Sequence, residues 1–143
     1  MKHNKGFSLI ELLIVVAIIG IIAAIAVPKL LQSKAAANEA SAISAIRNIV
    51  TSQRTFSATV GSGTYANDLA SLQTAKLIDS VLGSGTKDGY AFTSSGGTNT
   101  FVVTGAPNVA GSTGTRYFFS DESGVIRYAT GAAATVASSP LGQ

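Results

Sequence analysis

The sequence predicts an α+β protein in which one long N-terminal helix packs on a small antiparallel sheet of three or four strands. An almost uninterrupted apolar run from Phe7 to Val27 begins the helix, and apolar residues at helical spacing continue it to about Phe56 or Ser57. Short segments in which apolar and polar residues alternate then follow, separated by glycine, serine and threonine. Helix first and strands afterwards is typical of the α+β class, and it predicts one globular head at residues 29–143.

The apolar run is long enough to cross a membrane. Its 21 residues include only three that are not apolar, namely Ser8, Glu11 and Gly20. At about 1.5 Å per residue they make a helix of roughly 31 Å, which matches a bilayer core of about 30 Å. An unpaired carboxylate inside that core costs a few kcal/mol, so Glu11 is a candidate functional residue. We expect a transmembrane helix at residues 7–28.

Beyond Pro28 the helix becomes amphipathic. Apolar residues recur every three or four positions, at Ala42, Ile43, Ile46, Ile49, Val50 and Phe56. The opposite, solvent side is expected to hold Asn38, Glu39, Arg47, Asn48 and Arg54. A coiled coil is the alternative interpretation, and it fits less well because the apolar stripe lasts less than three heptads and is rich in alanine.

Four segments have the character of strands, and turns with glycine join them in pairs at Ser94–Gly97 and Asp121–Gly124. The predicted strands run from Tyr90 to Thr93, Thr100 to Thr104, Thr115 to Ser120 and Val125 to Tyr128. The helix residues expected to pack on this sheet are Ile46, Ile49 and Val50, and their expected partners are Phe101, Val103 and one face of Tyr117 to Phe119.

A short helical turn is expected between the long helix and the strands. It contains Leu69 and Leu72, and either Thr64 or Asn67 is expected to cap it, because hydroxyl and amide side chains accept hydrogen bonds at helix N-termini.

The composition argues against catalysis and against a nucleic-acid partner. The chain has no cysteine, and its one histidine is His3, so the many serines have no imidazole base to activate them. The net charge is +3, and without Lys2 and Lys5 it is +1, with 8 basic and 7 acidic side chains. So small a charge does not indicate specific binding of nucleic acid. We expect no enzyme activity and no cofactor.

The residues from Lys5 to Leu12, in the order Lys-Gly-Phe-Ser-Leu-Ile-Glu-Leu, resemble the cleavage and methylation site of type IV pilins and type II secretion pseudopilins. A short basic leader precedes the apolar run, whereas an ordinary secretory signal carries its own apolar segment before the cleavage site. The resemblance implies the pilin fold and a leader peptide at residues 1–6. It also implies that prepilin peptidase cuts between Gly6 and Phe7, that the new amine of Phe7 is methylated, and that Glu11 acts in assembly.

Gly20 and Pro28 bracket a weak part of the helix. Proline in a helix interior costs about 3 kcal/mol or more, because it lacks an N–H donor and clashes with the preceding turn. The resemblance implies that this segment gains flexibility and unwinds when the subunit enters a filament. A tolerated kink, as in many membrane helices, remains the alternative.

Three functions remain open. The resemblance favours a structural subunit that polymerises through its N-terminal helix into a type IV pilus-like filament, for motility, adhesion or DNA uptake. A pseudopilin of a type II secretion system is the alternative, and an unrelated membrane-anchored binding module is the third. Major pseudopilins bind calcium in a C-terminal loop, where this chain offers only Asp121 and Glu122. Calcium takes six to eight oxygens, so these are weak candidates and no metal is predicted.

The resemblance also implies a location and partners. Before assembly the chain would be a single-pass protein of the bacterial inner membrane with its head in the periplasm, and after assembly it would be part of an extracellular filament. The implied partners are copies of the chain itself in a helical filament, prepilin peptidase, the pilus assembly machinery and, before assembly, the membrane lipid.

Overall fold

A computed structural model describes residues 6–142 and divides the chain into two compact units, Met1–Ser33 and Lys34–Gln143. One helix, α1 (Leu9–Ala58), begins in the first unit and ends in the second. The described part of the first unit consists of the start of α1 and the three residues before it. The second unit holds every other helix and strand.

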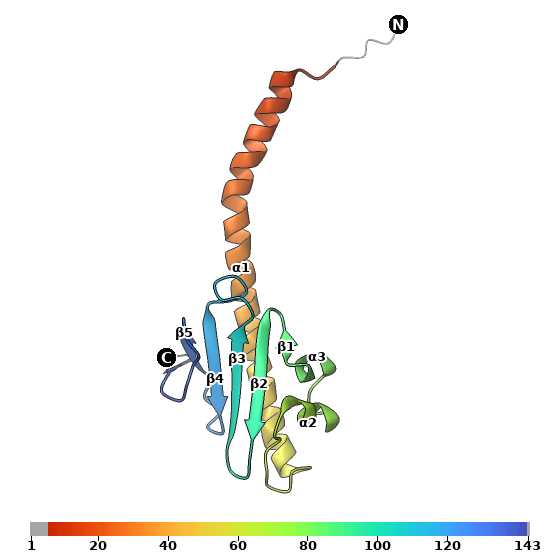
Figure 1. Cartoon of the computed structure of the whole chain (residues 1–143), viewed down its shortest axis with the longest axis vertical. Coiled ribbons are helices and arrows are strands. Elements are labelled where there is room, and N and C mark those ends of the chain that lie inside the picture. Colours follow the sequence, from red (N-terminus) through yellow and green to blue (C-terminus); the bar gives the residue numbers. More distant parts are fainter. Residues whose placement is uncertain (1–5, 143) are drawn as a thin grey trace. The chain divides into compact units, whose positions relative to one another are not determined.

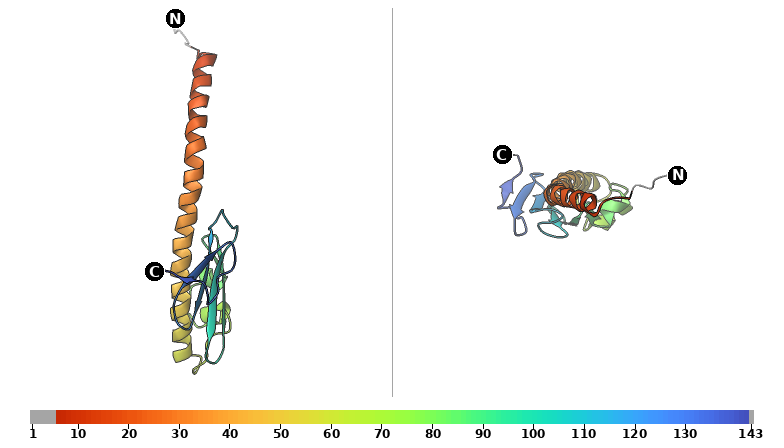
Figure 2. Two further views of the ribbon diagram at one scale, coloured as in Figure 1. Left: turned by 90° about the vertical axis from the view of Figure 1, so that its left-hand side faces the viewer. Right: turned by 90° about the horizontal axis from the view of Figure 1, so that it is seen from above.

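The second unit is a helix packed on a sheet (Figure 1). Six strands form one antiparallel sheet in the order β1-β2-β3-β4-β5-β6, so each strand pairs with the next one along the chain. The strands are β1 (Thr86–Lys87), β2 (Tyr90–Gly96), β3 (Phe101–Pro107), β4 (Arg116–Asp121), β5 (Arg127–Thr130) and β6 (Ser139–Pro140). The α1 residues of this unit lie along one face of the sheet, as Figure 2 shows from the side.

The α+β fold is confirmed, but the sheet has six strands and not the predicted three or four. The predicted segments correspond to β2 through β5, and the two short edge strands β1 and β6 are additional. Each has only two residues, which is too few to show the alternation by which a strand is recognised in a sequence. The first hairpin turn also comes later than predicted, because β2 continues to Gly96, which pairs with Phe101.

The core forms between the apolar stripe of α1 and the inner face of the sheet. The buried cluster contains all the residues predicted to meet there, namely Ile46, Ile49, Val50, Phe101 and Val103. On β4 the inward residue is Phe118, whereas Tyr117 and Phe119 are half-exposed. Gly105 lets α1 approach β3 closely, because a Cβ at that position would lie 3.1 Å from Cδ1 of Ile46. The predicted packing of helix on sheet is confirmed.

Three polar side chains of α1 are buried, namely Glu39, Ser52 and Gln53. The Ser52 hydroxyl donates to the carbonyl of Leu77 (3.0 Å). The prediction that Glu39 lies on the solvent side is wrong, since the residue is 7% exposed and is bound by the sheet. Gln53 is fully buried, and its amide accepts a hydrogen bond from the N–H of Ala66 (2.8 Å) and donates to the Ala66 carbonyl (2.9 Å) and Ser94 Oγ (2.8 Å). Buried polar groups persist when such partners satisfy them, and a hydropathy pattern does not reveal the partners.

Two short helices, α2 (Leu69–Thr74) and α3 (Ser80–Gly83), lead from α1 to the sheet. Asp68 caps α2 by accepting a 2.7 Å hydrogen bond from the N–H of Ser71, so the prediction of Thr64 or Asn67 as the cap is wrong. The helix begins at Leu69, one residue later than a cap at Asn67 would place it, which brings Asp68 into the capping position.

Candidate processing and assembly site

The predicted cleavage site lies at the start of the described chain. Gly6 and Phe7 are both exposed, and α1 begins two residues later, at Leu9. Most of the predicted leader, Met1 to Lys5, lies outside the described residues. The peptide bond between Gly6 and Phe7 is therefore on an exposed, non-helical segment just before the helix.

The fold of the described chain does not require glycine at position 6 or at position 20. No described neighbour lies within 4 Å of the place where a Cβ would be at Gly6 or Gly20, and neither residue has a positive φ. Glycine inside a helix costs roughly 0.5–1 kcal/mol relative to alanine, so Gly20 destabilises α1, and no contact with a described residue requires glycine at this position. The described chain therefore gives no packing reason for glycine at either position.

Glu11 caps the helix that it belongs to. The N–H of Ser8 donates a 2.9 Å hydrogen bond to Oε2 of Glu11, and Ser8 directly precedes the first helical residue. This is one half of a capping box, in which a glutamate in the first turn reaches back to the N-cap amide. The sequence analysis missed this role, although a serine followed three residues later by glutamate is its usual signal.

The same hydrogen bond fixes where the carboxylate lies relative to the predicted cut. Cleavage between Gly6 and Phe7 would leave an ammonium on the nitrogen of Phe7, one residue before the amide that Glu11 already accepts. A carboxylate has about four acceptor positions, so Glu11 can bind a further donor without losing its cap. The site thus holds an acceptor beside the end at which the new positive charge would form.

Pro28 lies inside α1, and the helix continues through it to Ala58. The proline removes one backbone hydrogen bond, so the helix is intrinsically weaker there. Whether Gly20 and Pro28 make the helix flexible stays a prediction.

The apolar side chains of the first unit are turned to solvent in the single chain. All described residues before Ala35 are exposed, and the large apolar ones between Phe7 and Leu31 expose from about half to more than four-fifths of their surface. By length and composition α1 is apolar enough to cross a membrane. Exposed apolar surface on this scale marks contact with lipid or with other protein.

Hydrogen bonds within the Asp121–Glu122 turn and to α1 stabilise the hairpin of β4 and β5. The Asp121 carboxylate accepts hydrogen bonds from the N–H and the hydroxyl of Ser123, and the carbonyl of Glu122 accepts one from the Arg54 guanidinium (3.1 Å). Within residues 6–142 no group of three or more acidic, histidine or cysteine side chains is placed to hold a metal ion. The turn therefore offers at most two carboxylates, one of which is already engaged.

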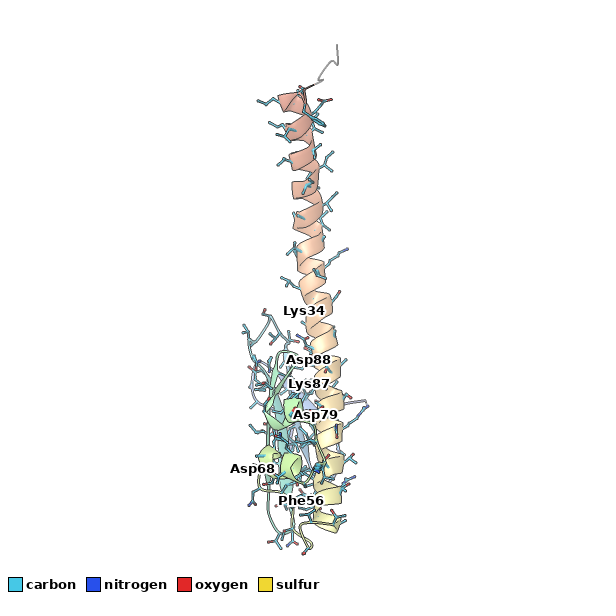
Figure 3. The ribbon with its side chains drawn as sticks, turned by 90° about the vertical axis from the view of Figure 1, so that its right-hand side faces the viewer. Lys34, Phe56, Asp68, Asp79, Lys87 and Asp88 are labelled. Carbon is cyan, nitrogen blue, oxygen red and sulfur yellow. The ribbon has the colours of Figure 1, made fainter. Side chains whose placement is uncertain are left out.

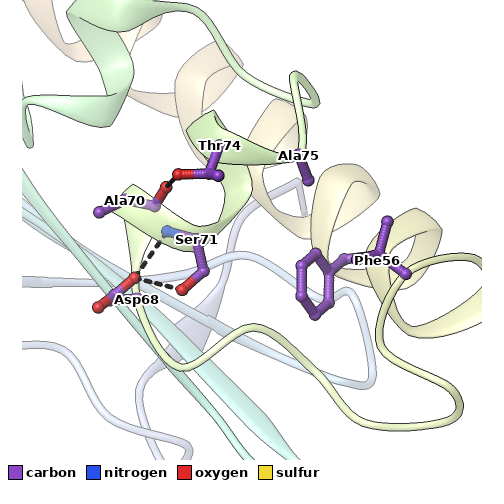
Figure 4. A pocket seen from close by; sticks show the side chains of 7 residues that line it. Phe56, Asp68, Ala70, Ser71, Thr74 and Ala75 are labelled. Carbon is purple, nitrogen blue, oxygen red and sulfur yellow. Dashed lines mark hydrogen bonds between the residues drawn. The ribbon is translucent and has the colours of Figure 1, made fainter.

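A surface hollow of about 460 Å³ lies between the end of α1 and α2 (Figure 4). Phe56 and Val60 form one side, and Asp68 and Ser71 form the other. Hydrogen bonds from Ser71 lower the pKa of the Asp68 carboxyl, so this group is occupied by its capping role. Its lining residues do not present an arrangement of acid, base and nucleophile.

Comparison with known proteins agrees with this N-terminal site. Residues 1–27 match the family described as the prokaryotic N-terminal methylation motif. The type IV major pilin protein PilA of Myxococcus xanthus is 47% identical over 54 residues, which are 38% of this chain and 24% of that protein. The type IV wide pilus major component PilA4 of Thermus thermophilus is 38% identical over 72 residues, which are 50% of this chain and 53% of that protein. A fimbrial protein of Pseudomonas aeruginosa is 76% identical over 29 residues, which are 20% of this chain and 19% of that protein.

The chain combines a methylation motif, an exposed apolar helix segment and a head in which a helix packs on a sheet. The chain is similar to type IV pilins, since residues 1–27 match the methylation motif and two relatives are named as a type IV major pilin and a type IV wide pilus major component. The chain spans from about a fifth to about half the length of the curated relatives it matches.

Proposed function

We propose that this chain is a structural subunit of a type IV pilus-like filament. It enters the bacterial inner membrane by the apolar part of α1, loses residues 1–6 to prepilin peptidase and is methylated on Phe7. It then polymerises through α1, with its head first in the periplasm and finally on the outside of the filament. Motility, adhesion and DNA uptake are the functions such a filament would serve.

One observation carries the proposal: the exposed Gly6–Phe7 bond is followed by a helix that is apolar except for Glu11 in its first turn. The exposed apolar surface requires lipid before assembly and neighbouring helices afterwards. Among the described residues none lies within 4 Å of the place where a Cβ of Gly6 would be, which agrees with selection of a minimal side chain by a peptidase. Two relatives that match part of the chain are named as a type IV major pilin and a type IV wide pilus major component.

The test is the mass of the protein in the filament. Filaments sheared from cells and dissolved should yield a chain that begins at Phe7, lacks the mass of Met1 to Gly6 and carries one methyl group on its amine. Gly6→Leu should leave the full-length precursor in the membrane, because the peptidase must fit the side chain before the cut. Filament protein that starts at Met1 would contradict the proposal.

A pseudopilin of a type II secretion system is the second candidate, and no observation favours it over a pilus subunit. The Asp121–Glu122 turn presents two carboxylates and not the larger oxygen set that calcium prefers. The relatives that match part of the chain are named as pilin, pilus and fimbrial proteins. An abundant surface filament built from this chain would decide between the two.

A further inference from the structure

A cluster of polar side chains holds the first residues of α1 that have hydrogen-bond partners elsewhere in the described chain. We call this cluster the polar clasp, and its members are Asn38, Glu39 and Ser41 on α1, with Asp88, Thr113, Thr115 and Arg116 facing them. The bonded pairs are between 47 and 77 residues apart in the chain. The clasp therefore exists only when α1 is docked on the folded sheet.

Glu39 is the centre of the clasp. Its Oε1 accepts hydrogen bonds from the N–H and hydroxyl of Thr115 (2.7 and 2.9 Å), and its Oε2 accepts one from Nε of Arg116 (2.7 Å). The Arg116 guanidinium also lies over the rings of Phe118 and Tyr128, 5.7 and 5.4 Å from their centroids. Charge-assisted hydrogen bonds are about twice as strong as neutral ones, and removing one partner of a buried pair leaves the other charge uncompensated.

Two further contacts flank this pair. Asn38 Nδ2 donates to the carbonyl of Thr113 (2.9 Å), and the Ser41 hydroxyl donates to Oδ2 of Asp88 (2.6 Å), which Figure 3 labels beside α1. Asp88 and Gly89 form the turn between β1 and β2, with φ of 47° and 76°. A Cβ on Gly89 would come within 2.9 Å of Thr113 Cβ, so this turn and the Thr113 loop pack directly together.

The clasp lies at a change in the environment of α1. Every described residue of the first unit is exposed, whereas the helix is part of the apolar core from Ala42 onward. A helix segment without tertiary partners is held only by its own hydrogen bonds, and such segments open at much lower free energy than packed ones. Unwinding that starts in the first unit therefore meets the clasp before it meets the core.

We propose that the polar clasp stops the unwinding of α1 at residue 38. The second unit then keeps its fold while the chain before it changes conformation in lipid, in detergent or in a filament. The clasp suits this task better than apolar contacts do, because hydrogen bonds and an ion pair are lost abruptly when their geometry breaks, whereas apolar burial declines gradually. This inference goes beyond the proposed function and stands whether or not the chain polymerises.

Amide hydrogen exchange of the full chain in detergent micelles tests the inference. In Glu39→Gln the amide takes the place of the carboxylate and leaves Arg116 without its counter-charge. We expect the amides of residues 39 to 43 to exchange about tenfold faster or more, because local opening now passes residue 38. The amides of β2, β3 and β4 should keep their slow exchange.

Two controls make the result specific. Glu122→Gln removes the same charge from an exposed turn and should leave the exchange of α1 unchanged. Ile46→Val weakens the core and should accelerate helix and strand amides together. If Glu39→Gln also accelerates the helix and strand amides equally, or leaves their exchange unchanged, the polar clasp does not stop unwinding.

If Glu39→Gln fails to fold, Ser41→Ala removes one exposed contact of the clasp instead. Acceleration confined to the amides of residues 39 to 43 would support the inference, whereas unchanged or uniformly faster exchange would overturn it.

Discussion

Glu11 and Glu39 are the two acidic residues of α1, and their surroundings differ completely. Glu39 is buried and has partners for both oxygens within its own chain. Glu11 accepts one hydrogen bond from the Ser8 amide and is otherwise exposed among apolar side chains. Folding of the chain supplies the hydrogen-bond partners of Glu39. Glu11 keeps acceptor capacity for a partner, such as the amine of a neighbouring subunit.

We expect Glu11→Gln and Glu11→Leu to abolish or sharply reduce filaments while membrane insertion and cleavage continue. In a low-dielectric filament core, loss of the carboxylate leaves the Phe7 ammonium without a counter-charge, which costs about 3–5 kcal/mol. Electron microscopy of the cells, with an immunoblot for the mature chain, measures both outcomes, and Glu122→Gln is the matched control.

The pair of variants separates assembly from helix capping. Glutamine keeps the hydrogen-bonding role of glutamate in a capping box but removes its charge, whereas leucine removes both. If Glu11→Gln forms normal filaments and Glu11→Leu does not, Glu11 acts only as a cap. Normal filaments from both variants would contradict the prediction that Glu11 acts in assembly.

At the scale of elements, α1 carries two different surfaces in series. Its first-unit part presents apolar side chains on all sides, which suits lipid or a bundle of helices. Its second-unit part has one buried stripe and an outer side on which Arg47, Thr51 and Arg54 are exposed. One continuous helix can therefore serve a membrane or filament core at one end and a water-soluble head at the other.

Ile46 should be among the most sensitive positions of the head. It is fully buried and lies against Gly105 of β3, so Ile46→Ala leaves a cavity that the rigid sheet cannot fill. Such substitutions cost about 2–5 kcal/mol. We expect the full chain in detergent to unfold at a clearly lower temperature by near-ultraviolet circular dichroism, and Thr51→Ala on the exposed side to unfold close to the wild type. An unchanged midpoint for Ile46→Ala would contradict the helix-on-sheet packing.

For the whole molecule, the head is stabilised without disulfides, because the chain has no cysteine. Sequential antiparallel pairing of six strands, one apolar core and the clasp hold it together. Burial raises the pKa of Glu39, but the hydrogen bonds from Thr115 and Arg116 outweigh burial and hold that pKa below its usual value of 4.5. Stability that depends on an ionised carboxylate must therefore vary with pH.

We expect the thermal midpoint of the head to fall as the pH drops below about 4.5. A carboxyl whose folded pKa is lowered contributes its full stabilisation above the unfolded pKa and loses it as the pH falls through the folded pKa. Of the groups that face Glu39, Arg116 stays charged. Tyr90, whose pKa is raised to about 12 by burial and then by the charge of Glu39, stays neutral. Unfolding measured from pH 7 to pH 2 should show a smaller loss in Glu39→Gln, and an equal loss would exclude Glu39 as a cause.

Local signals in the sequence determined much of this protein. The apolar run, the Gly6–Phe7 motif and the position of Glu11 are contiguous features, so no folding information was needed to recognise them. The helical spacing of Ile46, Ile49 and Val50 likewise predicted the buried face, because one helix face repeats every three to four residues. Four of the six strands followed from alternation and turn residues.

Tertiary structure decided the features that depend on partners distant in the chain. Glu39 and Gln53 are polar and were not expected in the core, yet each is buried because residues 13 to 77 positions away satisfy its hydrogen bonds. The edge strands β1 and β6 exist because β2 and β5 offer them unpaired backbone groups, and two residues alone carry no periodic signal. Hydropathy is a property of single residues, whereas hydrogen bonding requires two groups to meet, and the folded chain alone determines which groups do.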